Sequence, residues 1–340
     1  MQNLLIILAC ILPTSYSDCW SKKNASTILK TVIVPSNRRQ TVPAVSPQKI
    51  TVNDSLPLHF WQLLHHELRW PIPNHPLIKQ QKQRYLNDHY HFHLVTQRAQ
   101  PYLAWITIQI KQRQLPMELV LLPMVESAFN PHAHSAKGAA GLWQITQQTG
   151  QHYGVPSNAW YDGRWDIVQA TETALTLLTD LNRRFNGDWL LTLAAYNGGA
   201  TRISQAIKER KRQAPQEKIN FWSLKLPPET KMHVIKLLAL SSILRHPQQH
   251  GISLPTLDPL QSLVYLDVGQ PFTLSQISSL TDLPLTCLKA FNPGYRQATT
   301  GPTGPYHLLL PQNRINRFKK ALARTKGRQQ LLIADIIKST

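Results

Sequence analysis

The hydrophobic residues in the middle of the chain recur at helical spacing. Between residues 55 and 250, apolar side chains return every three or four positions, with polar side chains between them. A period of 3.6 residues is typical of amphipathic α-helices. The clearest segment has the apolar residues Ile167, Ala170, Ala174, Leu178 and Leu181. We therefore predict that residues 55–250 are almost entirely helical.

Short polar signals predict where several of these helices begin and end. Asp162 and Asp166 precede the segment just described, so their carboxylates are candidates to cap its first turn. Gly187 and Asp188 are expected to end that helix and to cap the next one. The Asn-Gly-Gly sequence at 197–199 is expected to stop that next helix, because glycine tolerates the positive φ that a helix end often needs.

Further helices are predicted on both sides of that region. One stretch carries Leu77, Tyr85, Phe92 and Val95, and a separate one carries Leu103, Ile106, Ile108 and Ile110. Residues 118–129 form a buried helix in this interpretation, with Pro123 bending it or marking its start. Another helix is predicted over residues 230–244.

The pattern changes after Pro255. Residues 263–268 and 307–311 are predicted strands, and two short helices are predicted between them over 273–280 and 284–291. This C-terminal module, residues 262–312, is a small β-α-α-β unit that we expect to pack on the main body, because so few residues bury little surface alone. Residues 313–340 predict a basic amphipathic tail, whose apolar side docks on its own protein more often than on a membrane.

The N-terminal residues predict export. Residues 1–17 combine a short apolar run with a small-x-small sequence, as in a signal peptide, although no Lys or Arg precedes the run. Cys10 is an alternative lipid acceptor that would associate the mature protein with a membrane. Residues 18–53 are polar and without period, which predicts a flexible linker, and residues 54–105 predict a helical extension.

Charge and cysteine content narrow the possible partners. There are 37 Lys and Arg against 18 Asp and Glu, a net charge of +19, so the surface attracts polyanions. The polyanion could be nucleic acid, anionic lipid or a cell-wall polymer with acidic groups, and the charge alone does not choose among them. Export and the lack of zinc-finger or RNP-like motifs argue against nucleic acid. The predicted location is the periplasm or cell envelope. Cys19 and Cys287 are far apart in the sequence and make no disulfide framework. We expect one tail cysteine and one core cysteine, both unpaired, and a single bridge in an oxidising compartment is the alternative.

Glu126 is the candidate catalytic residue. It ends the apolar run of residues 119–125, where loss of hydration favours the protonated carboxyl that a general acid needs. Glycosidases with two carboxylates place the second one within about 5–10 Å of the first. No acid is a convincing partner here, since Glu118 lies about two helical turns earlier. The pattern favours a reaction in which the substrate supplies its own nucleophile.

Three motifs follow one another in a specific order. They are Glu126-Ser127, then Gly141-Leu142-Trp143-Gln144, then Ala195-Tyr196-Asn197. In this order they resemble the signature motifs of the family 1 lytic transglycosylases, and other segments resemble the D branch of that family. The resemblance covers residues 55–325. It implies a mainly α fold with a lysozyme-like transglycosylase (SLT) domain over residues 106–255.

The resemblance implies a reaction and roles for the site residues. The substrate would be the β-1,4 bond between N-acetylmuramic acid and N-acetylglucosamine in peptidoglycan strands, cleaved with no cofactor. Glu126 would protonate the glycosidic oxygen and then accept the proton of the muramoyl 6-hydroxyl, closing a 1,6-anhydro ring with help from the 2-acetamido group. Ser135 would lie near that acetamido group, Gln144 would bind the sugar, Tyr196 would orient Glu126, and Asn197 would hold the neighbouring turn.

Structural interpretations of the same residues remain open. Gln144 could be a hydrogen bonder at a helix start, Tyr196 a core aromatic, and Asn197 part of a plain helix stop. Trp143 could be a packing residue or a sugar platform. The enzyme could also be a lysozyme-type hydrolase, or the protein a non-catalytic peptidoglycan binder.

The C-terminal module resembles a degenerate LysM fold, which implies either glycan binding or a purely structural role.

No metal is expected. His89, His91 and His93 splay around a helix axis, and no third ligand accompanies His132 and His134.

Overall fold

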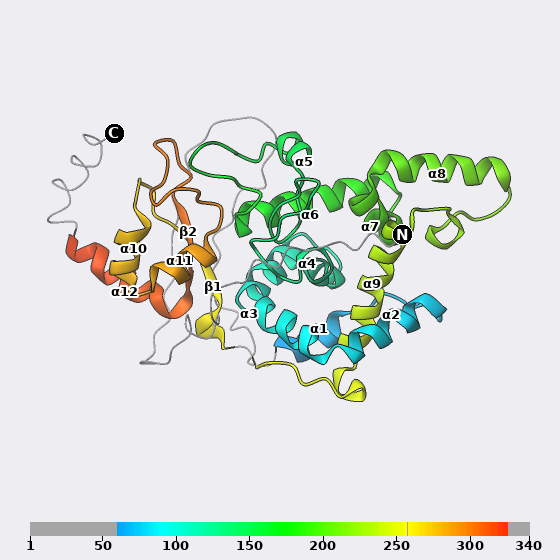
Figure 1. Ribbon diagram of the computed structural model, residues 1–340, viewed down its shortest axis with the longest axis horizontal. Coiled ribbons are helices and arrows are strands. Elements are labelled where there is room, and N and C mark those ends of the chain that lie inside the picture. The colour runs from blue at the N-terminus through cyan, green and yellow to red at the C-terminus, as the bar shows by residue number, and fades with distance from the viewer. Residues whose placement is uncertain (1–59, 257, 326–340) are drawn as a thin grey trace.

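The structure is a computed structural model that describes residues 60–256 and 258–325. The predicted signal peptide and linker, the start of the N-terminal extension and the end of the tail lie outside these residues. Figure 1 shows a larger helical body, with α8 projecting at one end and the C-terminal module at the other. The predicted mainly α architecture is confirmed for the described residues.

The helical body contains nine α-helices among the described residues. They are α1 (Phe60–Glu67), α2 (Pro76–Asn87), α3 (His89–Gln112), α4 (Leu122–Ser127), α5 (Gln147–His152), α6 (Ile167–Arg184), α7 (Trp189–Gly198), α8 (Ala200–Gln213) and α9 (Pro228–Arg245). Short 3-10 helices lie at Met117–Leu121, Phe221–Ser223, Pro247–His250 and Pro259–Gln261.

Helix α3 differs from the sequence prediction. It is one helix of 24 residues that contains Pro101, whereas we predicted a break between Val95 and Leu103. The break lies at Asp88 instead, because its carboxylate accepts the backbone N–H of His91 at 3.0 Å and caps the start of α3.

The predicted helix over residues 118–129 is two shorter pieces. A 3-10 turn over Met117–Leu121 leads into α4, and Pro123 occupies the first turn of α4, where its missing N–H costs nothing. Helix α4 ends at Ser127, because Ala128 and Phe129 both adopt positive φ, 50° and 52°. The chain therefore turns sharply at Ala128, directly after Ser127 and two residues after Glu126.

Two of the three predicted aspartate caps are confirmed. The Asp166 carboxylate accepts the N–H of Gln169 at the start of α6, and Asp188 caps α7. The prediction for Asp162 is wrong: its buried carboxylate binds the guanidinium groups of Arg164 and Arg296, each at 2.8 Å. Burial alone would raise the pKa of Asp162, but hydrogen bonds and charge from the two arginines hold it below its usual value.

Helices α7 and α9 meet closely. Helix α7 ends before Gly199, whose φ is 86°, as the Asn-Gly-Gly sequence predicted. At Gly198 a Cβ atom would lie only 2.9 Å from Oγ1 of Thr230, in the first turn of α9. Glycine at this position therefore lets α9 pack directly beside α7, and α9 also contacts α4.

The predicted β-α-α-β order of the C-terminal module is confirmed. Strands β1 (Leu263–Asp267) and β2 (His307–Pro311) pair antiparallel, with Leu263 opposite Pro311 and Asp267 opposite His307. Helices α10 (Leu274–Thr281) and α11 (Leu285–Phe291) lie between them in sequence. Helix α12 (Gln312–Thr325) follows β2 directly, and its side chains Ile315 and Phe318 are buried against the module.

The C-terminal module is joined to the helical body by polar contacts as well as by packing. The N–H of Asp162 donates to the carbonyl of Gly294 at 2.9 Å, and Tyr161 pairs with Tyr295. Nε2 of His307 lies 2.8 Å from a carboxylate oxygen of Asp166, and both side chains are nearly buried. These contacts place the module against the start of α6.

Cysteine pairing differs from the prediction. Cys287 is buried in α11 and is disulfide-bonded, so the prediction that it is an unpaired core cysteine is wrong. Cys10 and Cys19 lie outside the described residues. The prediction rested on the separation of the cysteines along the sequence, and this separation does not determine which segments meet in the fold.

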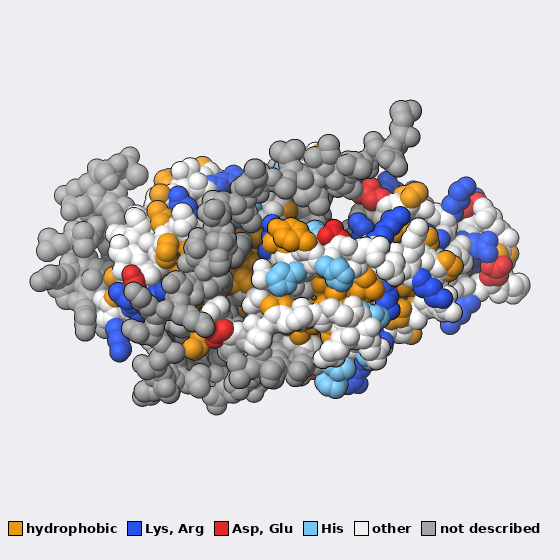
Figure 2. Space-filling view, turned by 60° about the horizontal axis from the view of Figure 1, so that its bottom comes forward, with side chains coloured by type: hydrophobic (Ala, Val, Ile, Leu, Met, Phe, Trp, Pro, Cys, Tyr) orange, Lys and Arg blue, Asp and Glu red, His pale blue; other side chains and the backbone are white. Residues whose placement is uncertain are grey.

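The surface of the described residues is basic at both ends. In Figure 2, Lys and Arg side chains lie toward the two ends of the molecule, while histidine and hydrophobic side chains occupy the middle of that face. In sequence, helices α8 and α12 are rich in Lys and Arg, including Arg202, Lys208, Arg314 and Lys319. Within residues 60–256 and 258–325, no helix is both long enough and apolar enough to cross a membrane.

Candidate active site

Glu126 lies in the last turn of α4, with its side chain only 11% exposed. The residues before it, Leu122, Pro123 and Met124, are buried, as the apolar run predicted. Oε1 of Glu126 lies 2.7 Å from Nε2 of His233, which the first half of α9 provides. The carboxyl group is therefore held at one oxygen in a largely dry environment.

The segment Gly141-Leu142-Trp143-Gln144 packs directly against the end of α4. The Ser127 hydroxyl donates to the carbonyl of Leu142 at 2.9 Å. Gly141 has φ 75°, and a Cβ atom there would lie 2.3 Å from the carbonyl oxygen of Arg164. Only glycine fits this close approach, so this residue allows the segment to reach Glu126.

Gln144 braces the loop that precedes it. Its backbone adopts φ 49°, and its Nε2 donates to the carbonyls of Gly141 at 2.9 Å and Ala133 at 3.1 Å. An amide nitrogen has two N–H groups, so both are committed. The group that Gln144 can offer to a ligand is its carbonyl oxygen Oε1, an acceptor.

Tyr196 lies in the last two turns of α7, beside the same segment. Its hydroxyl donates to the carbonyl of Trp143 at 2.7 Å. That Tyr196 orients Glu126, as the resemblance implies, stays a prediction. Burial raises the pKa of Tyr196 well above its usual value, and the charge of Glu126 adds to the effect. Tyr196 is thus a neutral donor close to Glu126 that fixes the neighbouring backbone.

The other two predicted site residues lie around this centre. Ser135 is half-buried, and its Oγ accepts the backbone N–H of Ala139 at 3.0 Å in the loop that Gln144 braces. Asn197 is half-buried and follows Tyr196 in the last turn of α7. The structure therefore brings Glu126, Gln144 and Tyr196 together, with Ser135 and Asn197 on adjoining segments.

Trp143 is a packing residue in the structure. Its side chain is fully buried, and its Nε1 donates to the hydroxyl of Thr171 in α6 at 2.9 Å. A buried ring offers no face to a sugar, so Trp143 holds the segment against α6.

His233 is the site residue that the sequence analysis missed. It shares the buried face of α9 with Thr230 and Leu237, and only 6% of its side chain is exposed. The signal in the sequence that could have found it is the spacing of His233 from the apolar residues of the predicted helix 230–244, which places this histidine on the buried side of the helix. We considered other histidines as metal ligands only, and a contact between residues 107 positions apart leaves no local pattern.

The neighbouring carboxylates have other partners. Glu118 accepts the backbone N–H groups of Arg69 and Trp70 at 2.5 and 2.6 Å, while Asp166 pairs with His307 and Asp188 caps α7. Glu229, at the start of α9, is half exposed and lies 4.0 Å from Nζ of Lys137. These commitments favour chemistry with a single carboxyl group.

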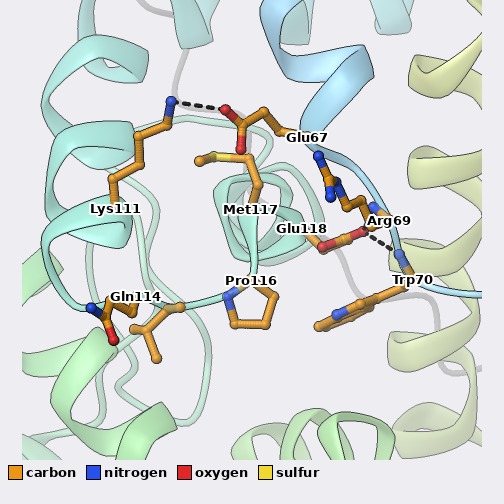
Figure 3. Close-up of a pocket in the computed structure, with 9 residues that line it drawn as sticks. Glu67, Arg69, Trp70, Lys111, Gln114, Pro116, Met117 and Glu118 are labelled. Carbon is orange, nitrogen blue, oxygen red and sulfur yellow. Dashed lines mark hydrogen bonds and ion pairs between the residues drawn. The ribbon is translucent and has the colours of Figure 1, made fainter.

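A separate cavity of about 590 Å³ lies beside α1, away from Glu126. Figure 3 shows its lining, where Glu67 pairs with Lys111 and Glu118 points to the backbone of Trp70. Arg245 donates to the Trp70 carbonyl at 2.7 Å behind it. Three of its charged groups, those of Glu67, Lys111 and Glu118, bind one another or the backbone, and Glu126 is not among its lining residues. This cavity is therefore not the candidate active site.

The described residues contain no group of three or more His, Cys, Asp or Glu that could hold a metal ion. The absence of a metal requirement stays a prediction.

Comparisons with known proteins agree with the geometry. Residues 104–219 match the family model "Transglycosylase SLT domain", and residues 262–327 match "Lytic transglycosylase MltD, LysM-like domain". These matches confirm the predicted lysozyme-like and LysM-like parts of the fold.

Individual proteins are similar over different lengths. The chain is 43% identical over 277 residues to membrane-bound lytic murein transglycosylase D from two strains of Escherichia coli, K12 and O6:H1. That alignment covers 81% of this chain and 61% of each relative, so the chain spans about three fifths of their length. A solved structure of an inactive mutant of lytic transglycosylase Slt from Pseudomonas aeruginosa is 24% identical, with a TM-score of 0.35, over 46% of this chain and 25% of that one.

Proposed function

Because this chain belongs to the lytic transglycosylases with an SLT domain, we propose that it cleaves peptidoglycan strands without net hydrolysis. The bond is the β-1,4 linkage between N-acetylmuramic acid and N-acetylglucosamine, and the product carries a 1,6-anhydro-N-acetylmuramic acid end. The observation that carries this proposal is a lone, nearly buried carboxyl, Glu126, at the meeting point of the three motifs.

One carboxyl group is sufficient for this reaction. The protonated Glu126 gives its proton to the glycosidic oxygen as the bond from that oxygen to C1 of the muramoyl ring breaks. The 2-acetamido group supports C1 in the role that a second carboxylate plays in other glycosidases. The 6-hydroxyl oxygen then bonds to C1 while its proton passes to the Glu126 carboxylate. The residue ends in the state in which it began, and no water is consumed.

The surrounding residues supply binding groups in this proposal. Oε1 of Gln144 accepts a hydrogen bond from an N-acetyl N–H or a hydroxyl group, because both N–H groups of its amide are committed to the loop. Ser135 and Asn197 flank the bound sugar. Tyr196 holds the backbone of Trp143 in place, which fixes the position of Gln144 next to it.

The location that we propose is the cell envelope. The apolar N-terminal run supports export through a signal peptide, with lipidation of Cys10 as the alternative mode of membrane association. The disulfide at Cys287 supports an oxidising compartment such as the periplasm. Glycan strands are the proposed partner of the C-terminal module, and the basic surface attracts their acidic substituents. The predicted export argues against a role with nucleic acid.

Replacing the catalytic carboxyl tests the proposal. With purified sacculi as substrate, Glu126→Gln is expected to release anhydro-muropeptides at least ~100-fold more slowly, because an amide cannot give or take the proton. Mass spectrometry of the soluble products measures the rate and identifies the ends. Glu209→Gln, an exposed carboxyl on α8, is the matched control and is expected to act like the wild type.

The products also separate the alternatives. Reducing ends in place of anhydro ends would make the protein a lysozyme-type hydrolase. Binding to sacculi with no products from the wild type would make it a non-catalytic wall binder. Undiminished release by Glu126→Gln would refute the assignment of the catalytic residue.

A further inference from the structure

His233 is the side chain that contacts the Glu126 carboxyl. Its Nε2 lies 2.7 Å from Oε1 of Glu126, and the exposed fractions of the two side chains are 6% and 11%. At this distance the two atoms share a hydrogen bond, and water has little access to it.

The other ring nitrogen decides which atom carries the hydrogen. Nδ1 of His233 is buried and has no hydrogen-bond partner among the described residues. A buried N–H group without an acceptor costs more than an unused lone pair, so the neutral ring places its hydrogen on Nε2. Nε2–H then donates to Oε1 of Glu126.

We propose that His233 is a positioning residue that binds Oε1 of Glu126 as a neutral Nε2–H donor and leaves Oε2 to exchange the proton with the substrate. This inference rests on the proposed role of Glu126. It assigns the two carboxyl oxygens different tasks: Oε1 is the anchored oxygen, and Oε2 is the oxygen that carries the proton to and from the sugar.

The hydrogen bond serves both states of Glu126. When Glu126 is protonated on Oε2, its carbonyl oxygen Oε1 accepts from Nε2–H. After the proton has moved to the glycosidic oxygen, the same Nε2–H meets a carboxylate, and a hydrogen bond to a charged acceptor is stronger. The contact therefore favours the step in which the acid gives up its proton, and the carboxyl group need not rotate between the two steps.

The neighbourhood of His233 offers no competing partner at hydrogen-bond distance among the described residues. Tyr196 of α7 is neutral and donates to Trp143. Glu118 accepts the backbone N–H of Arg69, which follows α1. Arg245, at the far end of α9, lies 3.9 Å from the Glu118 carboxylate. The other charged and titratable side chains of α9 and of the described helices packed against it form no hydrogen bond to the His233 ring.

Two substitutions separate a hydrogen-bond donor from a proton carrier. His233→Gln places an amide N–H at the position of Nε2 but cannot be charged, whereas His233→Leu removes the donor at similar size. On sacculi, we expect kcat of the Gln variant to stay within about threefold of the wild type and that of the Leu variant to fall ~10- to 100-fold with KM little changed, because a misplaced catalytic group costs about this much. His91→Gln, an exposed histidine on α3, is the control.

Histidine nitrogen NMR of the full chain measures the tautomer in the wild-type protein, and the His233→Gln variant is needed only to assign the signals. In protein labelled with ¹⁵N-histidine, we expect the His233 signals, identified by their loss in His233→Gln, to show a protonated Nε2 and an unprotonated Nδ1 at pH 7. Two protonated nitrogens, or a hydrogen on Nδ1, would overturn the proposal.

The kinetic outcomes are equally decisive. Wild-type kcat in the Leu variant would overturn the positioning role. A Gln variant as slow as the Leu variant would overturn the neutral-donor role, provided that thermal unfolding curves show both variants to be folded. A wild type that releases no anhydro ends while Glu126→Gln behaves identically would instead refute the proposed function on which the inference rests.

Discussion

At the scale of single residues, the candidate site depends on a few backbone positions that tolerate no side chain. Gly141 combines a positive φ with a 2.3 Å approach to the carbonyl of Arg164, and it lies one residue before the carbonyl that Ser127 binds. A side chain here would push the segment away from α4. Gln144 and the carbonyl that receives the Tyr196 hydroxyl would move with it.

Gly141→Ala is therefore expected to lower both stability and activity. The positive φ costs about 1–2 kcal/mol in the free energy of unfolding, and the forced shift of packed backbone adds about 1–3 kcal/mol. Gly187→Ala is the matched control, since Gly187 has φ 83° with no atom within 4 Å of the added Cβ. Thermal unfolding and anhydro-product release measure both variants. Equal losses in the two would show that the close approach to Arg164 has no effect.

The residues of the candidate site could be predicted only where a local motif marks them. Glu126, Gln144 and Tyr196 carry such motifs, and the structure brings them together. His233 has no motif, and it reaches Glu126 through the packing of α9 against α4 and α7, which local sequence does not reveal. The mistaken cap at Asp162 has a similar cause, because Arg296 lies 134 positions later in the sequence.

At the scale of secondary-structure elements, the sequence predicted the ends of a helix or strand well when the residues that end it lie within or next to that element. The module's two strands and two helices begin and end within one or two residues of the prediction, since turn residues and alternation are read within each segment. The break between α2 and α3 was misplaced because periodicity continues through Asp88 and Pro101 alike. Only the geometry of the Asp88 side chain shows which of them ends a helix.

The start of α7 offers a test of such a local signal. The Asp188 carboxylate accepts the N–H groups of Leu190 and Leu191 at 2.9 and 3.0 Å. Asp188→Ala is expected to cost about 1 kcal/mol in the free energy of unfolding, because two N–H groups at the helix start lose their acceptor. Asp188→Asn keeps an acceptor oxygen and is expected to recover most of that loss. Urea unfolding followed by circular dichroism measures both, and equal stability of the Ala variant and wild type would contradict the cap's contribution.

At the scale of the whole molecule, the C-terminal module and the helical body share a buried ion pair. Burial alone would lower the pKa of His307, but the charge and hydrogen bond of Asp166 raise it above its usual value of 6.5. Burial alone would likewise raise the pKa of Asp166, yet His307 and backbone N–H groups at the start of α6 lower it below its usual value of 3.8. Asp166 thus caps α6 and binds β2 at the same time, which couples the helical body to the C-terminal module.

The coupling predicts a pH dependence of stability with a definite sign. The raised pKa of His307 stabilises the fold fully below pH 6.5, and this contribution is lost as pH rises through the higher folded pKa. The lowered pKa of Asp166 stabilises the fold above pH 3.8, and that contribution is lost as pH falls through the lower folded pKa. The ion pair is therefore expected to contribute most between about pH 4 and 6.5 and to weaken toward alkaline pH.

His307→Gln tests this dependence, because it keeps a hydrogen-bond donor for Asp166 and removes the charge. We expect the melting temperature of the wild type to exceed that of the variant near pH 5 and the difference to shrink toward pH 9. Amide hydrogen exchange should locate the change at β2 and the start of α6, the two elements that the pair joins. His152→Gln, an exposed histidine at the end of α5, controls for loss of any imidazole. Melting curves that differ by the same amount at every pH would show that packing and the neutral hydrogen bond hold the module in place without the charge.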